Sequence, residues 1–342
     1  MVRWTALVLA GWLGLAHADP LVERLEQEED FSGVLLVGDI EGNASFRSVG
    51  FADEAAERAF SEDDVWRWAS VTKQLIGVLI MQQVEAGSLS LDDTMAERLP
   101  EAKTKYADQI TVRDLMRHTS GMRLPRAFPG PEDDVIEFCV RKAKRKPDTR
   151  VEYNGCETVL AAEILNRVSG RNWRELMREQ IFQPVGMTRT IVKAPGQDAE
   201  TVVGYQAAGT VERPIDVGLL DADSSVVGVA ADLVKFNAAL MRGDLMSDAS
   251  RDALWQGEGR LGFVAIGAWS FSARLKGCGD APVKMIERRG GLNGIQARNF
   301  IVPEKGKSLV VFTNRQNQEF GEVWMGQGLS YDLLSEVMCS GA

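Results

Sequence analysis

Histidine and cysteine are scarce in this chain, which has two His and four Cys among 342 residues. No C-x-x-C pair occurs, and His118 is the only histidine after residue 18, so no zinc ligand set of ordinary spacing is present. Positive charge is also short: 39 Lys and Arg against 49 Asp and Glu give a net charge of -10, which argues against nucleic-acid binding. We therefore expect no metal, no other cofactor and no nucleic-acid partner.

Internal repeats and low-complexity tracts are also absent from the sequence. Hydrophobic residues at 45% and charged residues at 26% are ordinary globular values. At roughly 150 residues per domain, the 342 residues allow about two domains and an ample core. A small scaffold that depends on disulfides is thereby excluded.

The first 18 residues have the pattern of a secretory signal peptide. Arg3 precedes an apolar run from Trp4 to Ala16, and Ala16-His17-Ala18 forms a small-x-small cleavage site. The run is shorter than the ~20 apolar residues of a spanning helix, so an uncleaved anchor is the less favoured alternative. We expect a periplasmic or secreted protein with no stable membrane insertion after cleavage.

The four cysteines would face an oxidising compartment after export, where an even number can pair. Three connectivities are possible, and proximity in the sequence favours Cys139–Cys156 with Cys278–Cys339. Four separate buried thiols are the alternative, because a chain of this length can build its core without disulfides.

Strand-like runs occur near both ends of the chain, and helical patterns occupy the middle. The expected strands cover residues 33–37, 45–51, 263–273, 283–288, 295–302 and 308–313. The expected helices cover residues 71–86, 111–118, 132–146, 156–169 and 173–182, with a last helix through Leu329, Leu333 and Val337. This order predicts a mixed α/β fold. Residues 19–60 and 256–342 would form a sheet domain, residues 61–255 a mainly helical domain, and the active site would lie in a cleft at their junction.

Ser70-Val71-Thr72-Lys73 carries the strongest chemical signal in the chain. Ser70 comes just before a helix that is apolar almost all round, so its side chain would lie at the positive end of a buried helix. Lys73 follows one turn later, and at i+3 its ammonium and the Ser70 hydroxyl share a face within hydrogen-bonding reach. A lysine without its hydration can act as a base or as a charge that steadies a deprotonated partner. The hydroxyl then becomes a usable nucleophile.

The stretch 66–93 around this motif resembles the nucleophile region of the penicillin-recognising serine hydrolases, the superfamily of class C β-lactamases, DD-peptidases and related esterases. Further segments resemble the family in order: LMRHTSG at 115–121, Tyr153 before a helix that ends at Gly170, PVGMT at 184–188, and GGLNG at 290–294 leading to VFTNR at 311–315. The resemblance implies a β-lactamase/transpeptidase-like fold, in which an antiparallel sheet is flanked by the N- and C-terminal helices and carries a large helical insertion.

The resemblance implies that Ser70 is acylated, with Lys73 and Tyr153 as the pair that handles its proton. A nearby ammonium favours a phenolate, so Tyr153 can take the proton and later deliver it to the leaving group. The backbone N–H groups of Ser70 and Gly291 would form the oxyanion hole. His118 is expected to be structural, because a Ser-Lys-Tyr site leaves an imidazole no task. We also expect Lys73→Ala to cut acylation at least ~100-fold with little change in melting temperature.

Arg288 stands where the family carries Lys or His, on the strand that lines the site. Its planar fork would face a substrate carboxylate or the tyrosine, and Gly290 on the same strand is expected to bind substrate as well. An edge strand kept soluble by its charges is the alternative interpretation.

The chain departs from the family at one position. The family pattern is Tyr-x-Asn, but here the sequence is Tyr153-Asn154-Gly155, so glycine replaces an amide that contacts both the lysine and the acylamide group of the substrate. Asn154 is a candidate to bind substrate in its place if the loop shifts. Loss of the amide weakens recognition of β-lactams and peptides more than that of a small ester.

These residues predict a serine hydrolase that acts on an ester, lactone, amide or D-amino-acid peptide with an acidic group near Arg288. Esterase or peptidase activity ranks above β-lactamase activity. The alternative is a non-catalytic protein that binds or senses cell-wall fragments on the same fold. The intact set of Ser70, Lys73 and Tyr153 argues against that alternative, and the oligomeric state is left open.

Overall fold

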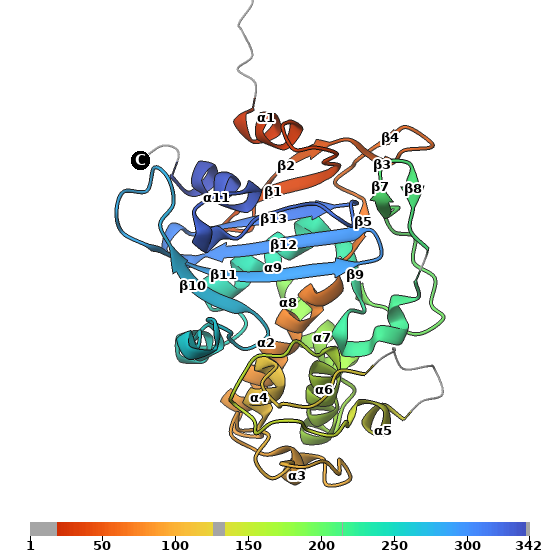
Figure 1. Ribbon diagram of the computed structural model, residues 1–342, viewed down its shortest axis with the longest axis vertical. Helices are drawn as coiled ribbons and strands as arrows, with labels where there is room; N and C mark the ends of the chain where they lie inside the picture. The colour runs from red at the N-terminus through yellow and green to blue at the C-terminus, as the bar shows by residue number, and fades with distance from the viewer. Residues whose placement is uncertain (1–18, 126–133, 214, 340–342) are drawn as a thin grey trace, which may run out of the picture.

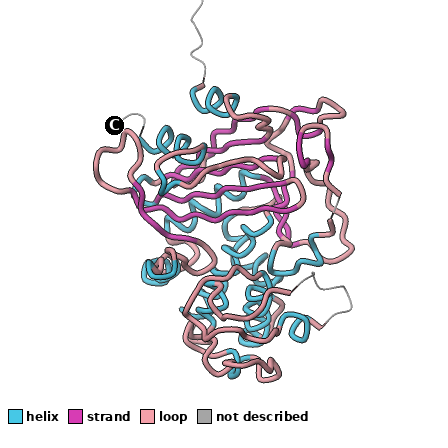
Figure 2. The backbone as a smooth tube through the Cα atoms, in the orientation of Figure 1, coloured by secondary structure: helices cyan, strands magenta, loops and turns pink. Residues whose placement is uncertain are grey.

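The computed structural model describes residues 19–125, 134–213 and 215–339 (Figure 1). The predicted signal peptide lies outside the described residues. A six-stranded sheet occupies the upper part of the molecule, and many of the helices gather below it (Figure 2). No helix among the described residues is both long and apolar enough to cross a bilayer.

The sheet is built from both ends of the chain, as the sequence predicts. Its strands are β1 (Gly33–Asp39), β2 (Ala44–Val49), β10 (Trp269–Ala273), β11 (Val283–Leu292), β12 (Ile295–Val302) and β13 (Lys307–Thr313). The order is β10-β11-β12-β13-β1-β2, and each neighbouring pair is antiparallel. β1 joins the two ends of the chain by pairing with β13 from Gly33↔Thr313 to Asp39↔Lys307.

Alternation along β1 sends side chains into two cores, one on each face of the sheet. Val34 and Leu36 enter the core shared with α9 (Ala230–Arg242), whereas Leu35 enters the core shared with α1 (Pro20–Glu26) and α11 (Leu329–Cys339). The mixed α/β fold with an antiparallel sheet flanked by the N- and C-terminal helices is therefore confirmed. Because α9 packs on β1 and β13, the segment 61–255 also supplies a helix that covers the sheet.

The helices below the sheet largely follow the sequence patterns. They are α2 (Thr72–Glu85), α3 (Met95–Arg98), α4 (Val112–Arg117), α5 (Val135–Cys139), α6 (Gly155–Ser169), α7 (Trp173–Met177) with η2 (Arg178–Phe182), and α8 (Gln183–Val185). α10 (Asp248–Leu254) follows α9 beside α2.

Two expected elements are shorter than predicted. Of the helix expected over 132–146, the described residues 134–146 are helical only in α5, because Val140 turns extended and Lys144 N–H bonds Gly121 O at 2.8 Å. The strand expected from residue 263 begins only at Trp269, after a turn in which Phe263 and Gly267 have φ of 63° and 69°.

A three-stranded sheet that the sequence does not predict lies beside the turn that carries Ser70. β5 (Val65–Arg67), β9 (Val226–Val229) and β6 (Thr190–Val192) pair in the order β5-β9-β6. β5 runs into η1 (Ala69–Val71), whereas β9 follows η3 (Val217–Asp223), so their antiparallel pairing brings Ser70 close to Asp223. Two hairpins complete the sheets: β3 (Phe51–Asp53) with β4 (Arg58–Ala59), and β7 (Tyr205–Ala207) with β8 (Thr210–Val211).

The cysteine sulfurs lie in the two pairs that sequence proximity favours. Cys139 and Cys156 have Cα atoms 5.1 Å apart, and Cys278 and Cys339 have Cα atoms 4.9 Å apart. Both separations suit a disulfide. The first pair joins α5 to the start of α6, and the second joins the segment after β10 to the end of α11.

Candidate active site

Ser70 lies on a tight turn between β5 and the buried helix α2. Ala69, just before it, has φ of 48°, a left-handed conformation that few residues with a side chain adopt. Thr72 holds the turn by donating its hydroxyl to Ala69 O at 2.7 Å and accepting from Val226 N–H at 3.2 Å. Ser70 is half-buried, whereas Lys73, one turn further along, is fully buried.

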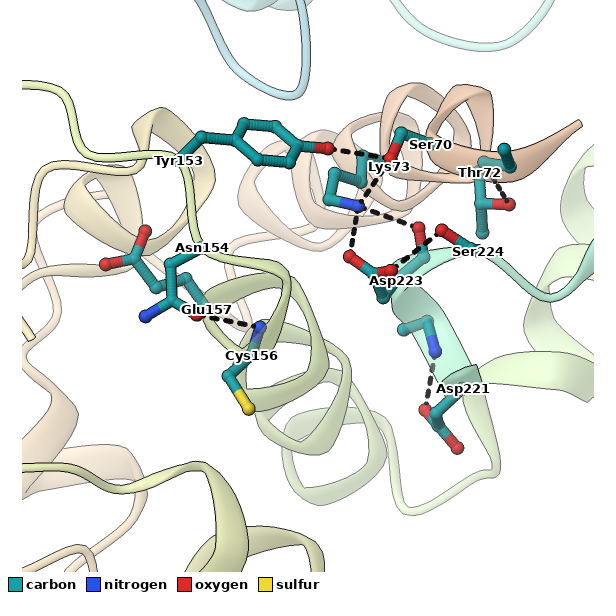
Figure 3. Close-up of polar contacts among 12 residues, drawn as sticks. Ser70, Thr72, Lys73, Tyr153, Asn154, Cys156, Glu157, Asp221, Asp223 and Ser224 are labelled. Atoms are coloured by element: carbon teal, nitrogen blue, oxygen red, sulfur yellow. Dashed lines mark hydrogen bonds and ion pairs between the residues drawn. The ribbon is translucent and has the colours of Figure 1, made fainter. Parts of the chain in front are cut away.

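The three residues predicted to be catalytic meet at the Ser70 hydroxyl. Lys73 Nζ donates to Ser70 Oγ at 3.1 Å, and the Tyr153 hydroxyl donates to the same oxygen at 2.7 Å (Figure 3). Tyr153 arrives from the loop before α6, so residues 83 positions apart in the sequence are joined by this contact. Helix geometry alone accounts for the Ser70–Lys73 contact, but the Tyr153 contact depends on the packing of α6 against α2.

Arg288 on β11 connects the turn to the tyrosine. Its Nε donates to Ser70 O at 2.7 Å, and its Nη2 donates to the Tyr153 hydroxyl at 2.6 Å. Arg288 is 1% exposed. Of the two partners expected for its fork, the geometry therefore supports the tyrosine rather than a substrate carboxylate.

Two cations set the acidity of Tyr153. Burial by itself raises its pKa, but the charges of Arg288 and Lys73 and the hydrogen bond with Ser70 outweigh burial and the opposing charge of Asp223. The pKa of Tyr153 consequently lies below its ordinary value of 10.0. A larger fraction of phenolate is then available to accept the Ser70 proton.

Two aromatic rings pack against Tyr153, which is 41% exposed. The His118 ring centroid lies 4.4 Å away, and Trp269 of β10 stacks at 6.4 Å and 23°. Trp269 also lies under the Arg288 guanidinium at 5.3 Å. The sequence analysis did not single out Trp269, because it lies within an expected strand with no local motif to mark it.

His118 belongs to a second set of polar side chains, which contacts Tyr153 through the His118 ring. Its Nδ1 lies 3.2 Å from Glu157 Oε2, and Ser120 Oγ donates to the other carboxyl oxygen of Glu157. Burial, followed by the charges of Arg288 and Lys73, holds the pKa of His118 well below 6.5, and burial holds the pKa of Glu157 well above 4.5. A neutral imidazole that packs on Tyr153 fits the structural role expected for His118.

Gly290 and Gly291 lie beside the nucleophile turn on β11. A Cβ at Gly290 would come within 2.6 Å of Trp68 O, so only glycine lets the strand approach the turn this closely. A Cβ at Gly291 would meet nothing within 4 Å, and this residue is exposed. The open space beside Gly291 suits the oxyanion hole expected from its N–H and that of Ser70.

Asn154 does not replace the missing family amide. It is fully buried and caps α6, with its Oδ1 accepting from Cys156 N–H at 3.2 Å. The geometry favours this capping role over the substrate contact expected from the sequence.

Asp223 of η3 contacts Lys73 instead, through both a carboxylate oxygen and its main-chain oxygen, the latter at 2.8 Å (Figure 3). No local motif marks Asp223, so the sequence alone does not indicate its role. The glycine at 155 was the only hint that another group fills this place.

Comparison with known proteins identifies the family. Residues 18–329 match the Beta-lactamase family. The chain belongs to the beta-lactamase family. Within this family, penicillin-binding protein 4* of Bacillus subtilis (strain 168) is 26% identical over 336 residues, which are 88% of this chain and 72% of that protein. Esterase EstB of Burkholderia gladioli is 31% identical over 196 residues, which are 50% of this chain and 50% of that protein.

The beta-lactamase-family fold is also found in solved structures. The D-amino acid amidase from Ochrobactrum anthropi SV3, complexed with L-phenylalanine amide, aligns with a TM-score of 0.75 and 20% identity over 93% of this chain and 97% of that one. Two other penicillin-binding proteins are matched over only 49% and 60% of their own lengths.

Within the described part of the chain, no group of three or more His, Cys, Asp or Glu is placed to hold a metal ion.

Proposed function

We propose that this beta-lactamase-family protein is a serine hydrolase that forms an acyl-enzyme on Ser70. The observation that carries the proposal is the meeting of Lys73 Nζ and the Tyr153 hydroxyl on Ser70 Oγ at 3.1 and 2.7 Å. Arg288 supports it by donating to the Tyr153 oxygen at 2.6 Å. A protein that only binds cell-wall fragments has no physical need for this arrangement.

The chemistry follows from the contacts. Tyr153 as phenolate takes the proton of Ser70, whose Oγ forms a bond to the acyl carbon of the substrate while the carbonyl electron pair moves onto oxygen. The N–H groups of Ser70 and Gly291 stabilise that oxyanion. The bond to the leaving group then breaks, and Tyr153 returns the proton to it. Water repeats the sequence on the acyl-enzyme and releases the acid.

The substrate class is an ester, lactone, amide or D-amino-acid peptide, and we rank esterase or peptidase activity above β-lactamase activity. The relatives include a protein named as an esterase and proteins named as penicillin-binding proteins. The absence of an amide at Gly155 supports the lower rank of β-lactams, because their acylamide group loses a partner.

A labelling experiment tests the mechanism. The purified protein is treated with a fluorophosphonate probe and offered a chromogenic short-chain ester, a chromogenic cephalosporin and a D-Ala-D-Ala peptide, with Ser70→Ala as the control. We expect intact mass to show one adduct on Ser70 and turnover of the ester or peptide. No adduct and no turnover with any substrate would refute the enzyme.

We also propose that the protein is exported and that its two cysteine pairs are disulfides. The approach of Cys139 to Cys156 and of Cys278 to Cys339 supports oxidation. Intact mass of the protein isolated from its source should show a chain that starts at Asp19 and takes up no alkylating reagent before reduction. A chain that starts at Met1 or four alkylated thiols would contradict this.

A further inference from the structure

Asp223 supplies two of the three oxygen atoms that accept hydrogen bonds from the ammonium of Lys73. Its carboxylate Oδ1 pairs with Lys73 Nζ, and its main-chain oxygen accepts from the same nitrogen at 2.8 Å (Figure 3). Ser70 Oγ accepts the third N–H at 3.1 Å. An ammonium has three N–H donors, so each donor of Lys73 has an acceptor beside the nucleophile.

Gly155 makes room for this carboxylate. A Cβ at Gly155 would lie 2.1 Å from Asp223 Oδ1 and 2.6 Å from its Cγ, closer than any real Cβ contact. Any other residue at position 155 would therefore displace Asp223 from Lys73. A carboxylate thus stands where the resemblance to the family leads one to expect an amide.

The exchange of amide for carboxylate changes what the site can recognise. An amide side chain donates and accepts hydrogen bonds, whereas an ionised carboxylate only accepts. The carbonyl oxygen of an N-acyl substituent would therefore meet another acceptor at this place. An ammonium group, by contrast, would find a charged partner.

Asp223 retains capacity for such a partner. Its two carboxylate oxygens offer about four acceptor sites, and the side-chain contacts are with Lys73 at Oδ1 and with Ser224 Oγ, 2.7 Å from Oδ2. The side chain is 15% exposed. In the proposed reaction Tyr153 begins as a phenolate. The two basic side chains, Lys73 and Arg288, then face two acidic groups, Asp223 and Tyr153, so the site has no excess of positive charge to repel the ammonium of a substrate.

We propose that Asp223 is a specificity-determining residue that accepts a hydrogen bond from a free ammonium group on the acyl part of the substrate. The enzyme would then prefer esters or amides of unprotected amino acids, and peptides with a free N-terminus, over N-acylated compounds and β-lactams. The proposal rests on the acyl-enzyme at Ser70 proposed above.

A matched pair of substrates tests the proposal on the unaltered protein. The p-nitroanilides of D- and L-alanine are compared at pH 7 with their N-acetyl derivatives, and p-nitrophenyl butyrate serves as a nitrogen-free reference for the acyl-enzyme chemistry. We expect kcat/KM to favour the free amine at least about 10-fold for the preferred chirality. The preference should shrink above pH 8, where the amine of the substrate loses its proton.

Equal or better turnover of the N-acetyl compounds would overturn the role of Asp223 while leaving the hydrolase in place. Failure to hydrolyse any compound, together with no labelling of Ser70, would overturn both proposals.

A variant pair sharpens the test. Asp223→Asn keeps the size of the side chain but supplies a donor, and it should lower the ratio of kcat/KM for free amine over N-acetyl substrate about 10- to 100-fold. Asp244→Asn is the matched control, because Asp244 pairs with Arg242 on the surface, and its ratio should equal that of the wild type. An unchanged ratio in Asp223→Asn would overturn the proposal, and the substrate comparison above decides it even if this variant does not fold.

Discussion

Two polar networks contact Tyr153, one at its hydroxyl and one at its ring, and they differ in how their buried groups are paired. The proposed catalytic network, made of Ser70, Lys73, Tyr153, Arg288 and Asp223, gives each basic side chain an oxygen partner. The supporting network of His118, Glu157 and Ser120 is buried without a cationic partner for its carboxyl group.

Burial lowers the pKa of His118 and raises that of Glu157, so burial favours the neutral form of both groups in the supporting network. Paired basic and acidic groups therefore lie at the hydroxyl of Tyr153, where the proposed proton transfer occurs, whereas groups whose neutral form is favoured pack against its ring.

Removal of the nucleophile gives the largest expected difference between the networks. Ser70→Ala should lower kcat/KM for the best ester at least about 1000-fold because the attacking atom is lost. The melting temperature should change little, because Lys73 keeps its two contacts with Asp223. Ser120→Ala makes the same change in the supporting network, where it removes the hydroxyl that donates to Glu157. It should lower the melting temperature and reduce activity far less. Equal losses of activity would erase the distinction between the networks.

Loss of Lys73 should cost at least about 100-fold in the rate of acylation. The ion pair with Asp223 revises the expectation for stability, because Lys73→Ala leaves that carboxylate without its cation. We expect the free energy of unfolding to fall by about 1–3 kcal/mol. The double variant Lys73→Met with Asp223→Asn removes both charges and should regain stability without activity. Stopped-flow acylation and denaturant titration check the two parts, and a fully stable Lys73→Ala would refute the energetic role of the pair.

Neutralisation of Arg288 should move the pH dependence of the reaction. The positive charge favours the Tyr153 phenolate, so Arg288→Met raises the pKa of Tyr153 and shifts the rising limb of kcat/KM toward higher pH. At pH 7 the loss is about 10-fold. Arg289→Met is the control, since Arg289 pairs with Glu287 and Glu322 rather than with Tyr153. A limb that moves equally in both variants would exclude a specific effect on Tyr153.

The smallest effect is expected in the supporting network. The folded-state pKa of Glu157 is raised by burial, so from about pH 4.5 upward the unfolded state releases this proton while the folded state keeps it. The stability contributed by this group is therefore lost as pH rises toward the folded-state pKa. Glu157→Gln cannot titrate, and its free energy of unfolding relative to wild type should rise with pH by at most about 1.4 kcal/mol per unit.

Urea titrations of Glu157→Gln at several pH values, with Glu163→Gln on the same helix as control, measure this slope. Parallel curves for wild type and Glu157→Gln would show that Glu157 is not held protonated by the fold.

Much of the fold could be predicted because its signals are local. β12 spans Ile295–Val302, the range that alternation indicates, and α6 spans Gly155–Ser169 against an expected 156–169. The expected helix over 132–146 was wrong beyond α5, since that segment bonds to a distant turn. The sheet β5-β9-β6 was not predicted, because its short strands are defined by their partners and not by a pattern of their own.

The Ser70–Lys73 pair follows from local spacing, because two residues three apart at the start of a helix share one face wherever that helix is placed. The contact of Arg288 with the tyrosine, and that of Asp223 with Lys73 150 positions away, depend instead on how distant segments pack. These partners come from β11 and η3, and their approach to Ser70 depends on strand pairing and on the space left by Gly155. No local spacing encodes contacts of that kind.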